Sequence, residues 1–298
     1  MTAAFLLPQA MAQTAPATGA LPSGGQVAAG QVSLATSGPA AAPTLTVTQG
    51  SDRAIVNWAA FDVGRDATVR FDQPSASAAI LNRVVGTDPS RIFGRLTANG
   101  QVFLVNPNGV YFSPTSSVDV GAFVASTLSI GDAEFLAGRL DFRRLGATGT
   151  IVNEGAIRSA LGGYVALLAP EVRNAGLIMA ETGSVLLAAG EAVSFNFDPA
   201  AGVTGLLVEP ARVRALVENG RIVRAPGGQV IVSAQAHNEM AAGVIRNTGE
   251  IAANGITTDG GRVMLGASES VEQGGLVDAS SPPARAARST SPRRPSPC

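Results

Sequence analysis

The residues whose types could support catalysis are few and scattered. Asp62, Asp66 and Asp72 lie close together in the sequence, and two carboxylates can flank a glycosidic bond or hold calcium. They fall at strand and turn positions outside any dense acidic cluster, so we interpret them as solvated corner residues. His237 is the only histidine and Cys298 the only cysteine, so we expect no transition-metal site.

The serines and glycines lack the context of known catalytic or phosphate-binding motifs. Ser184, Ser194 and Ser233 stand outside any G-x-S-x-G sequence. The pairs Gly24-Gly25 and Gly227-Gly228 lack the lysine and the hydroxyl residue of a phosphate loop. We therefore expect neither an enzyme nor a cofactor.

Composition favours a folded chain of strands and turns. Hydrophobic residues make up 46% and charged residues 14% of the 298 residues, which supplies ample apolar surface for a core. The 35 glycines suit a chain with many turns. The formal net charge of −1 gives no electrostatic reason to expect a nucleic-acid partner.

The chain repeats from Ile151 onward. Asparagine and glycine recur ahead of short apolar runs, and the copies begin at Asn153, Asn174, Asn219 and Asn247. Each unit is too short to bury its apolar face alone, so stacked units must share one core. Stacked asparagines can satisfy one another's amides, and we predict such a ladder between Asn153 and Asn174.

Apolar residues at every second position predict the inward face of these strands. The residues concerned are Val165, Leu167, Val185, Leu187, Val230, Val232, Val263 and Leu265. One segment interrupts the register: residues 195–216 contain two prolines and predict an insertion or hairpin outside the coil.

Residues 80–130 read as short strands separated by tight turns. The strongest turn is Asn106-Pro107-Asn108-Gly109, because proline presets the second turn position and asparagine and glycine suit the later ones. Residues 133–140 predict a short helix or a loop outside the coil; in a helix, Asp132 would be the cap and Gly138 the stop.

Several motifs in one order resemble the two-partner-secretion domain of the filamentous haemagglutinin family. They are Ser51–Trp58, Phe61–Gly64, Leu81–Val84, Asp88–Ile92, Asn106–Val110, Asp119–Gly121 and Ala125–Leu128. The resemblance implies an all-β fold, a right-handed parallel β-helix with an N-terminal cap and small extra-helical strands. It is strongest to the branch with large adhesins and haem-carrier-binding exoproteins.

The resemblance also implies an export route and a division of the chain. Ala10-Met11-Ala12 resembles a cleavage site, so residues 1–12 are expected to be a truncated signal peptide for Sec export. We expect a flexible leader over 13–29, the secretion domain over 30–145 and β-helix repeats over 146–279. Residues 280–298 predict a disordered basic tail.

The resemblance further implies a secreted or cell-surface exoprotein with an adhesin role. Its secretion module would be recognised by an outer-membrane β-barrel transporter with periplasmic adaptor domains. Asn106 to Gly109 are the expected secretion motif, and two roles stay open for them: direct recognition by the transporter, or a purely structural turn. A host-cell or surface receptor is a further expected partner.

Two alternatives remain open at this stage. One is a β-helical carbohydrate-active enzyme, a polysaccharide lyase or hydrolase, in which Trp58 and Phe61 would stack on sugar rings. We expect these two aromatic residues to pack inside the first coils instead. The other alternative is the passenger of an autotransporter.

Overall fold

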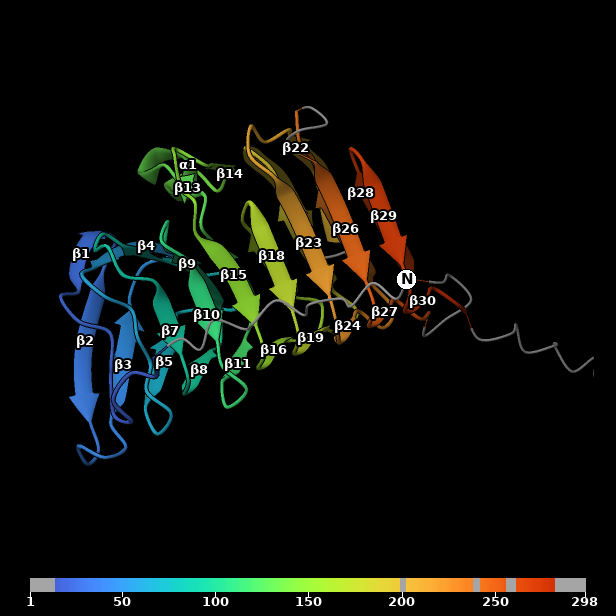
Figure 1. The fold of residues 1–298 in the computed structure, drawn as a ribbon. Helices are drawn as coiled ribbons and strands as arrows, with labels where there is room; N and C mark the ends of the chain where they lie inside the picture. Colours follow the sequence, from blue (N-terminus) through green and yellow to red (C-terminus); the bar gives the residue numbers. More distant parts are fainter. Residues whose placement is uncertain (1–13, 199–201, 238–241, 256–260, 282–298) are drawn as a thin grey trace, which may run out of the picture.

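The computed structural model of the protein describes residues 14–198, 202–237, 242–255 and 261–281. Across these residues the chain winds into a solenoid whose strands stack parallel from coil to coil (Figure 1). The predicted all-β, right-handed parallel β-helix is confirmed. None of the helices formed by the described residues has the length and apolarity needed to cross a membrane.

Three long sheets form the sides of the solenoid, and a fourth lies outside it. The nine-stranded sheet contains, in spatial order, β1 (Gln26–Ala29), β4 (Arg53–Trp58), β6 (Ala79–Val84), β9 (Gln101–Val105), β12 (Ala122–Ser126), β17 (Tyr164–Leu168), β20 (Ser184–Ala189), β25 (Gln229–Ala234) and β28 (Arg262–Ala267). The seven-stranded sheet contains β29 (Ser270–Gln273), β26 (Gly243–Asn247), β23 (Ala215–Asn219), β18 (Glu171–Asn174), β15 (Thr150–Asn153), β10 (Val110–Phe112) and β7 (Ser90–Ile92).

The remaining strands complete the coils and the outer layer. The ten-stranded sheet contains β2 (Val32–Ser37), β3 (Thr44–Gln49), β5 (Thr68–Asp72), β8 (Arg95–Ala98), β11 (Ser117–Val120), β16 (Ala156–Ser159), β19 (Leu177–Ala180), β24 (Ile222–Arg224), β27 (Glu250–Ala252) and β30 (Leu276–Asp278). The four-stranded sheet contains β13 (Ser129–Ile130), β14 (Leu140–Arg143), β21 (Ala192–Asp198) and β22 (Gly202–Glu209). The helix α1 spans Asp132–Leu136.

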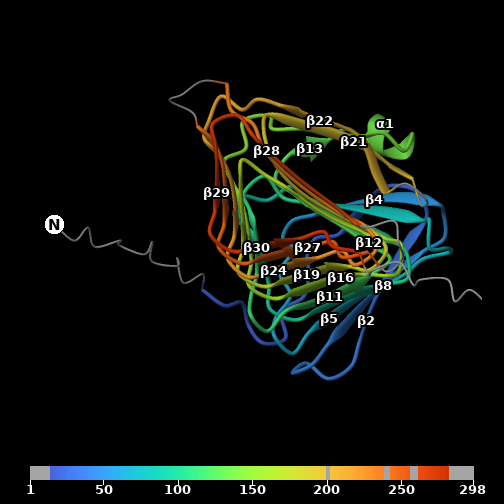
Figure 2. The ribbon, with the colours of Figure 1, turned by 90° about the vertical axis from the view of Figure 1, so that its right-hand side faces the viewer.

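Figure 2 shows the three long sheets approximately end-on. The main core fills the space that they enclose. The predicted inward face is confirmed, because Val165, Leu167, Val185 and Leu187 are fully buried in this core. Val230 and Val232 of the next coil are buried there too. Val263 and Leu265, in the last described coil of this sheet, are only partly buried against it.

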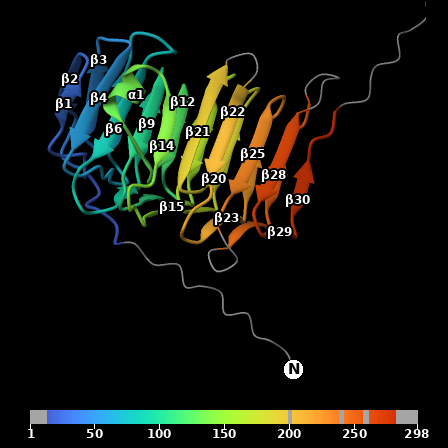
Figure 3. The same cartoon turned by 90° about the horizontal axis from the view of Figure 1, so that it is seen from above.

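A second core lies on the outer face of the nine-stranded sheet. The four-stranded sheet and α1 cover this face (Figure 3), and Leu186 and Ala188 of β20 are fully buried beneath them. Phe103 of β9 meets Phe135 of α1 edge to face at 5.2 Å between ring centroids. The nine-stranded sheet is therefore apolar on both faces over this span, as expected for a sheet covered on both sides.

Of the short helix or loop predicted here, the structure has a helix, and its cap differs from the prediction. Asp132 is the first helical residue, and Gly131 is the N-cap without a side-chain cap hydrogen bond. Asp132 instead pairs with Arg83 at 2.6 Å. Gly138 follows the helix at φ +77°, which agrees with its expected role as the stop.

The predicted asparagine ladder is confirmed and extends further than expected. The Nδ2 of Asn153 donates to the Oδ1 of Asn174 at 2.8 Å. The same bond joins Asn174 to Asn219 and Asn219 to Asn247, also at 2.8 Å, and Asn247 donates to Oε1 of Gln273 at 3.0 Å. All four asparagines are buried, so each amide depends on its neighbours in the ladder.

Three parts of the expected domain division need correction. Residues 18–29 are not a free leader: Thr18 accepts a backbone bond from Asp66, Ser23 bridges Ala60, and β1 pairs with β4. No break occurs at 145/146, because β10 pairs directly with β15 and one core runs through both parts. The insertion is the β21–β22 hairpin, which begins at Ala192 and ends at Glu209. The predicted signal peptide, residue 13 of the predicted leader and the part of the predicted tail after residue 281 lie outside the described residues.

Stacked glycines form one corner of the solenoid, just before the nine-stranded sheet. A Cβ on Gly183 would lie 1.9 Å from the carbonyl oxygen of Gly163, and one on Gly228 would lie 1.9 Å from that of Gly183. Side chains are excluded here because successive backbones stack at this corner.

We expect Gly183→Ala to lower the free energy of unfolding by about 3 kcal/mol, because two coils must separate to admit the methyl group. Gly162→Ala is the matched control. Gly162 has φ +74° but open space around its Cβ position, so this change should cost only about 1 kcal/mol of backbone strain. Urea unfolding measures both. Equal losses in the two variants would contradict the stacking argument.

Candidate functional site

The predicted secretion motif forms a tight turn between β9 and β10, and its first asparagine is inside the protein. Asn106 is fully buried, and its backbone carbonyl accepts the Gly109 N–H at 3.1 Å. The Nδ2 of Asn106 donates to Asp88 O and Ser90 Oγ, both at 3.0 Å. Its amide therefore ties this turn to the preceding coil.

The later residues of the motif are held by the same network. The backbone N–H of Asn108 donates to Oδ1 of Asn106 at 3.0 Å. The Asn108 side chain is exposed, yet its Nδ2 donates to Gly86 O at 2.9 Å and to Oδ1 of Asn106 at 3.1 Å. Gly109 has φ +121°, a conformation that favours glycine. Every polar contact of these side chains serves the fold.

Other residues of the motifs that carry the family resemblance also link neighbouring coils of the solenoid. Trp58 is buried, and its Nε1 donates to Oδ1 of Asn82 at 3.0 Å. Trp58 also meets Phe61 edge to face at 5.6 Å, so the expectation that both pack inside is confirmed. Arg91 holds Asp62 through Nη2 at 2.6 Å, and this hydrogen bond raises the pKa of the guanidinium.

The three aspartates considered as catalytic residues do not form a shared acidic site. Each forms an ion pair with a different arginine: Asp62 with Arg91 at 2.6 Å, Asp66 with Arg65 at 3.5 Å, and Asp72 with Arg70 at 2.7 Å. Within residues 14–198, 202–237, 242–255 and 261–281, no three His, Cys, Asp or Glu side chains are grouped to hold a metal ion.

The remaining candidates for nucleophile and base are also dispersed. Ser184, Ser194 and Ser233 lie on β20, β21 and β25, and His237 is an exposed residue after β25. Ser184 is buried and accepts hydrogen bonds from the Val203 N–H and from Nε2 of Gln229, both at 3.1 Å.

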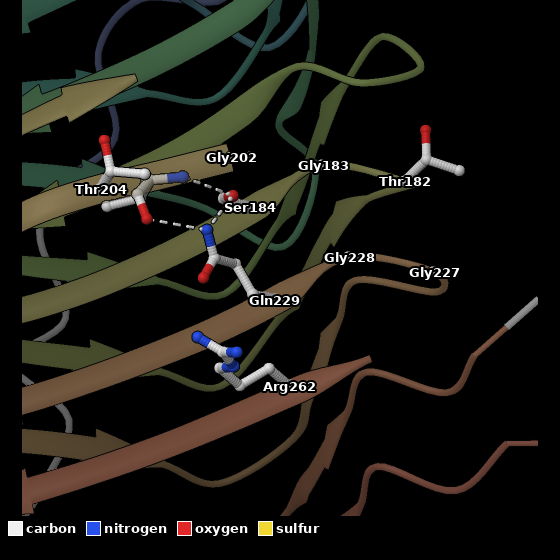
Figure 4. Close-up of a pocket in the computed structure, with 10 residues that line it drawn as sticks. Thr182, Gly183, Ser184, Gly202, Thr204, Gly227, Gly228, Gln229 and Arg262 are labelled. Carbon is white, nitrogen blue, oxygen red and sulfur yellow. Dashed lines mark hydrogen bonds between the residues drawn. The ribbon is translucent and has the colours of Figure 1, made fainter. Parts of the chain in front are cut away.

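Sequence reasoning missed a polar pocket beside Ser184 (Figure 4). It has a volume of about 420 Å³ and lies between β22 and the first residues of β20, β25 and β28. Gln229 and Arg262 contribute polar side chains, whereas those of Thr182 and Thr204 at its edges point away from them. One feature of the sequence could have indicated this place. The neighbouring coils have Gly162-Gly163 and Gly227-Gly228 at this corner, whereas this coil has Thr182-Gly183.

Comparison with known proteins decides the family. The sequence model of the TPS secretion domain matches residues 19–279, nearly the whole described part of the chain. The chain belongs to the TPS secretion domain family. This match confirms the family resemblance predicted from the sequence motifs. The matched region includes both the predicted secretion domain, 30–145, and the predicted β-helix repeats, 146–279.

Relatives of this TPS secretion domain come from Haemophilus influenzae. A heme/hemopexin-binding protein is 29% identical over 258 residues, which cover 84% of this chain and 27% of the relative. A second heme/hemopexin-binding protein is 29% identical, with 76% of this chain and 26% of the relative covered. The chain thus spans about a quarter of the length of the curated relatives it matches.

A solved structure supports the same assignment. The crystal structure of the HMW1 secretion domain from Haemophilus influenzae aligns with a TM-score of 0.76 at 28% identity, covering 87% of this chain and 67% of that chain. The described residues are therefore the secretion domain of a two-partner-secretion exoprotein.

Proposed function

We propose that this TPS secretion domain is the export address of a longer exoprotein. An outer-membrane β-barrel transporter with periplasmic adaptor domains reads it. The observation that carries this proposal is the match to a secretion-domain family over residues 19–279. The domain acts by binding and folding rather than by catalysis, which accords with the dispersed aspartates, serines and histidine.

The geometry of the Asn106–Gly109 turn supports recognition of the chain before it folds. Asn106 is fully buried, and the Asn108 amide is held by Gly86 and Asn106. The Asn106 amide is therefore accessible to a partner only before folding, and the Asn108 Nδ2 is engaged once the chain has folded. Parallel strands have non-local contacts and form slowly, which gives time for recognition. An extended segment can add to an exposed sheet edge of the transporter through main-chain hydrogen bonds.

Folding then supplies the direction of transport. Outside the membrane the coils stack and bury Val165, Val185 and their neighbours, and the folded solenoid cannot return through a pore sized for an extended chain. Two buried cores, one inside the solenoid and one beneath the four-stranded sheet, contribute apolar burial. No nucleotide or cofactor is required in this scheme.

The finer role of the full-length protein is part of the proposal. The chain enters the periplasm through the Sec route, with Ala10-Met11-Ala12 as the proposed cleavage site, and the product is released or retained at the cell surface. Two relatives are named for binding haem and hemopexin. An adhesin or haem-carrier-binding role, with a host-cell or surface receptor, fits that kinship, and no nucleic-acid partner is proposed.

Co-expression tests the export proposal. The chain, expressed behind a Sec signal peptide, is expected in the culture medium or on the cell surface only when its transporter is present. Without the transporter it should accumulate in the periplasm and be degraded. Immunoblots of medium, surface and periplasm measure the partition, with a periplasmic marker protein as the leakage control. Equal export without the transporter would contradict the proposal.

A further inference from the structure

The first strand of the ten-stranded sheet has a free edge. In the described part of the chain, β2 pairs with β3 alone. Figure 1 shows β2 at the end of the solenoid opposite β30. An edge strand presents a row of unpaired N–H and C=O groups, to which a strand of another chain can add.

The strand register shows which backbone groups point to this free edge. The carbonyl oxygen of Gln31 accepts the Gly50 N–H at 2.8 Å, so the residue before β2 belongs to a hydrogen-bonded pair. Hydrogen-bonded and non-hydrogen-bonded pairs alternate along an antiparallel ladder, and the β2–β3 register has no bulge. The N–H and C=O groups of Val32, Leu34 and Thr36 therefore point away from β3.

The main core is incompletely covered at this end of the solenoid. Leu34 lies opposite Val47, which is fully buried in the core, so the Leu34 side chain is on the core face of the sheet. Leu34 is nevertheless 37% exposed, and Val32 is only partly buried against the core. A further strand at this edge would cover apolar side chains as well as pair the free backbone groups.

The edge of β2 lacks the features that usually prevent strand addition. Proteins protect edge strands with charged residues, proline or a β-bulge. β1, the edge strand of the nine-stranded sheet at the same end, has a bulge between Val27 and Ala29. β2 has neither a bulge nor a proline, and residues 1–51 contain no Asp, Glu, Lys, Arg or His.

We propose that β2 pairs with β2 of a second copy of this chain, antiparallel and about a two-fold axis at Leu34. In this register Leu34 lies opposite the partner's Leu34, and Val32 lies opposite the partner's Thr36. These are the residues whose backbone groups point to the free edge, so each N–H meets a carbonyl oxygen of the other copy. The ten-stranded sheets of the two copies then join into one, and the two solenoids meet end to end.

The chemistry of this edge favours a second copy over a different protein. Because β2 carries no charge, it offers no ion pair to a charged partner strand, whereas two identical uncharged strands meet without repulsion. Directly opposed residues of an antiparallel pair lie on the same face and contact each other. The exposed part of each Leu34 side chain is thus covered by the other Leu34.

Sedimentation equilibrium of the full chain over a dilution series tests the pairing, under reducing conditions so that Cys298 cannot link two copies. Wild type is expected to form a reversible dimer. Ser33→Glu combined with Ala35→Glu places like charges directly opposite each other, because Ser33 faces the partner's Ala35. This double variant should raise the dimer Kd at least about tenfold. Both side chains are exposed, so the melting temperature should stay unchanged.

The matched control carries the same two charges one strand further in. Thr46→Glu combined with Thr48→Glu lies on β3, opposite Ala35 and Ser33 on the same face of the sheet. The control should leave the dimer Kd within about twofold of wild type. An equal loss of dimer in the control would show that net charge, and not the β2 edge, governs association, and would overturn the proposal.

A charge-swapped mixture supplies the positive test. Ser33→Arg combined with Ala35→Arg should be monomeric alone and should form a one-to-one heterodimer with the glutamate variant. Failure of this mixture to associate would overturn the proposal, as would a wild type that stays monomeric throughout the dilution series. If monomeric wild type instead binds the transporter's periplasmic region through β2, the edge belongs to that partner and the second copy is excluded.

Discussion

Replacing Val185 with aspartate is expected to unfold the domain or to lower its melting temperature by more than about 10 °C. Val185 is fully buried in the main core, and its neighbours in the adjacent coils are Val165 and Val230. No cation lies in this apolar stack to pair with a carboxylate. Burying an unpaired charge costs about 3–5 kcal/mol, a large part of the stability of a typical domain.

Thermal unfolding followed by circular dichroism measures this effect. Leu161→Asp is the matched control, because Leu161 is a 73% exposed leucine in the turn between β16 and β17. The control should change the melting temperature by no more than about 2 °C. If both variants melt alike, the Val185 side chain does not face the core that the structure assigns to it.

The second large effect is expected from Asn106→Ala. The change leaves Asp88 O, Ser90 Oγ and the Asn108 N–H without the bonds that Asn106 supplies. A buried polar group left unpaired costs about 1–3 kcal/mol. Ser90 is buried, whereas the bonds to Asp88 O and the Asn108 N–H are only partly buried, so we expect a loss of about 2–4 kcal/mol in the free energy of unfolding. Urea unfolding of the purified domain measures it.

Pro107→Ala is the comparison within the same turn. It keeps both asparagine amides, and its main effect is greater freedom of the unfolded chain, worth about 0.4–1 kcal/mol. If the transporter reads the amides, export should fall in Asn106→Ala beyond what its lost stability explains. If export falls only in proportion to lost stability in both variants, the motif has a structural role as a turn and the transporter does not read its amides.

The sequence predicted the interior of the solenoid well because identical positions recur. Asn153 and Asn174 occupy the same place in successive copies, and parallel stacking brings such residues together. On β20, Val185 and Leu187 face the main core, and Leu186 and Ala188 between them face the second core. Because both sets are apolar, alternation along the strand identifies the two faces but does not say what covers the second one. The second core requires the β21–β22 hairpin to fold back over β20, a contact set by tertiary packing.

The site was predicted only at the local level. Turn chemistry identified Asn106 to Gly109, because proline and glycine act on their own backbone. The targets of the Asn106 amide, Asp88 and Ser90, belong to the preceding coil, and local sequence does not indicate them. The same limit explains the error at Asp132, whose carboxylate binds Arg83 instead of capping α1.

Binding of the transporter's periplasmic region to folded and unfolded chain tests the central claim most directly. Three forms are compared on the immobilised region: folded wild type, wild type freshly diluted from urea, and Val185→Asp. The account predicts that wild type diluted from urea binds, that Val185→Asp binds in proportion to its unfolded fraction, and that the folded domain binds at least about tenfold more weakly than the unfolded wild type, because folding buries Asn106 and engages the Asn108 amide. Equal or tighter binding of the folded domain would contradict it.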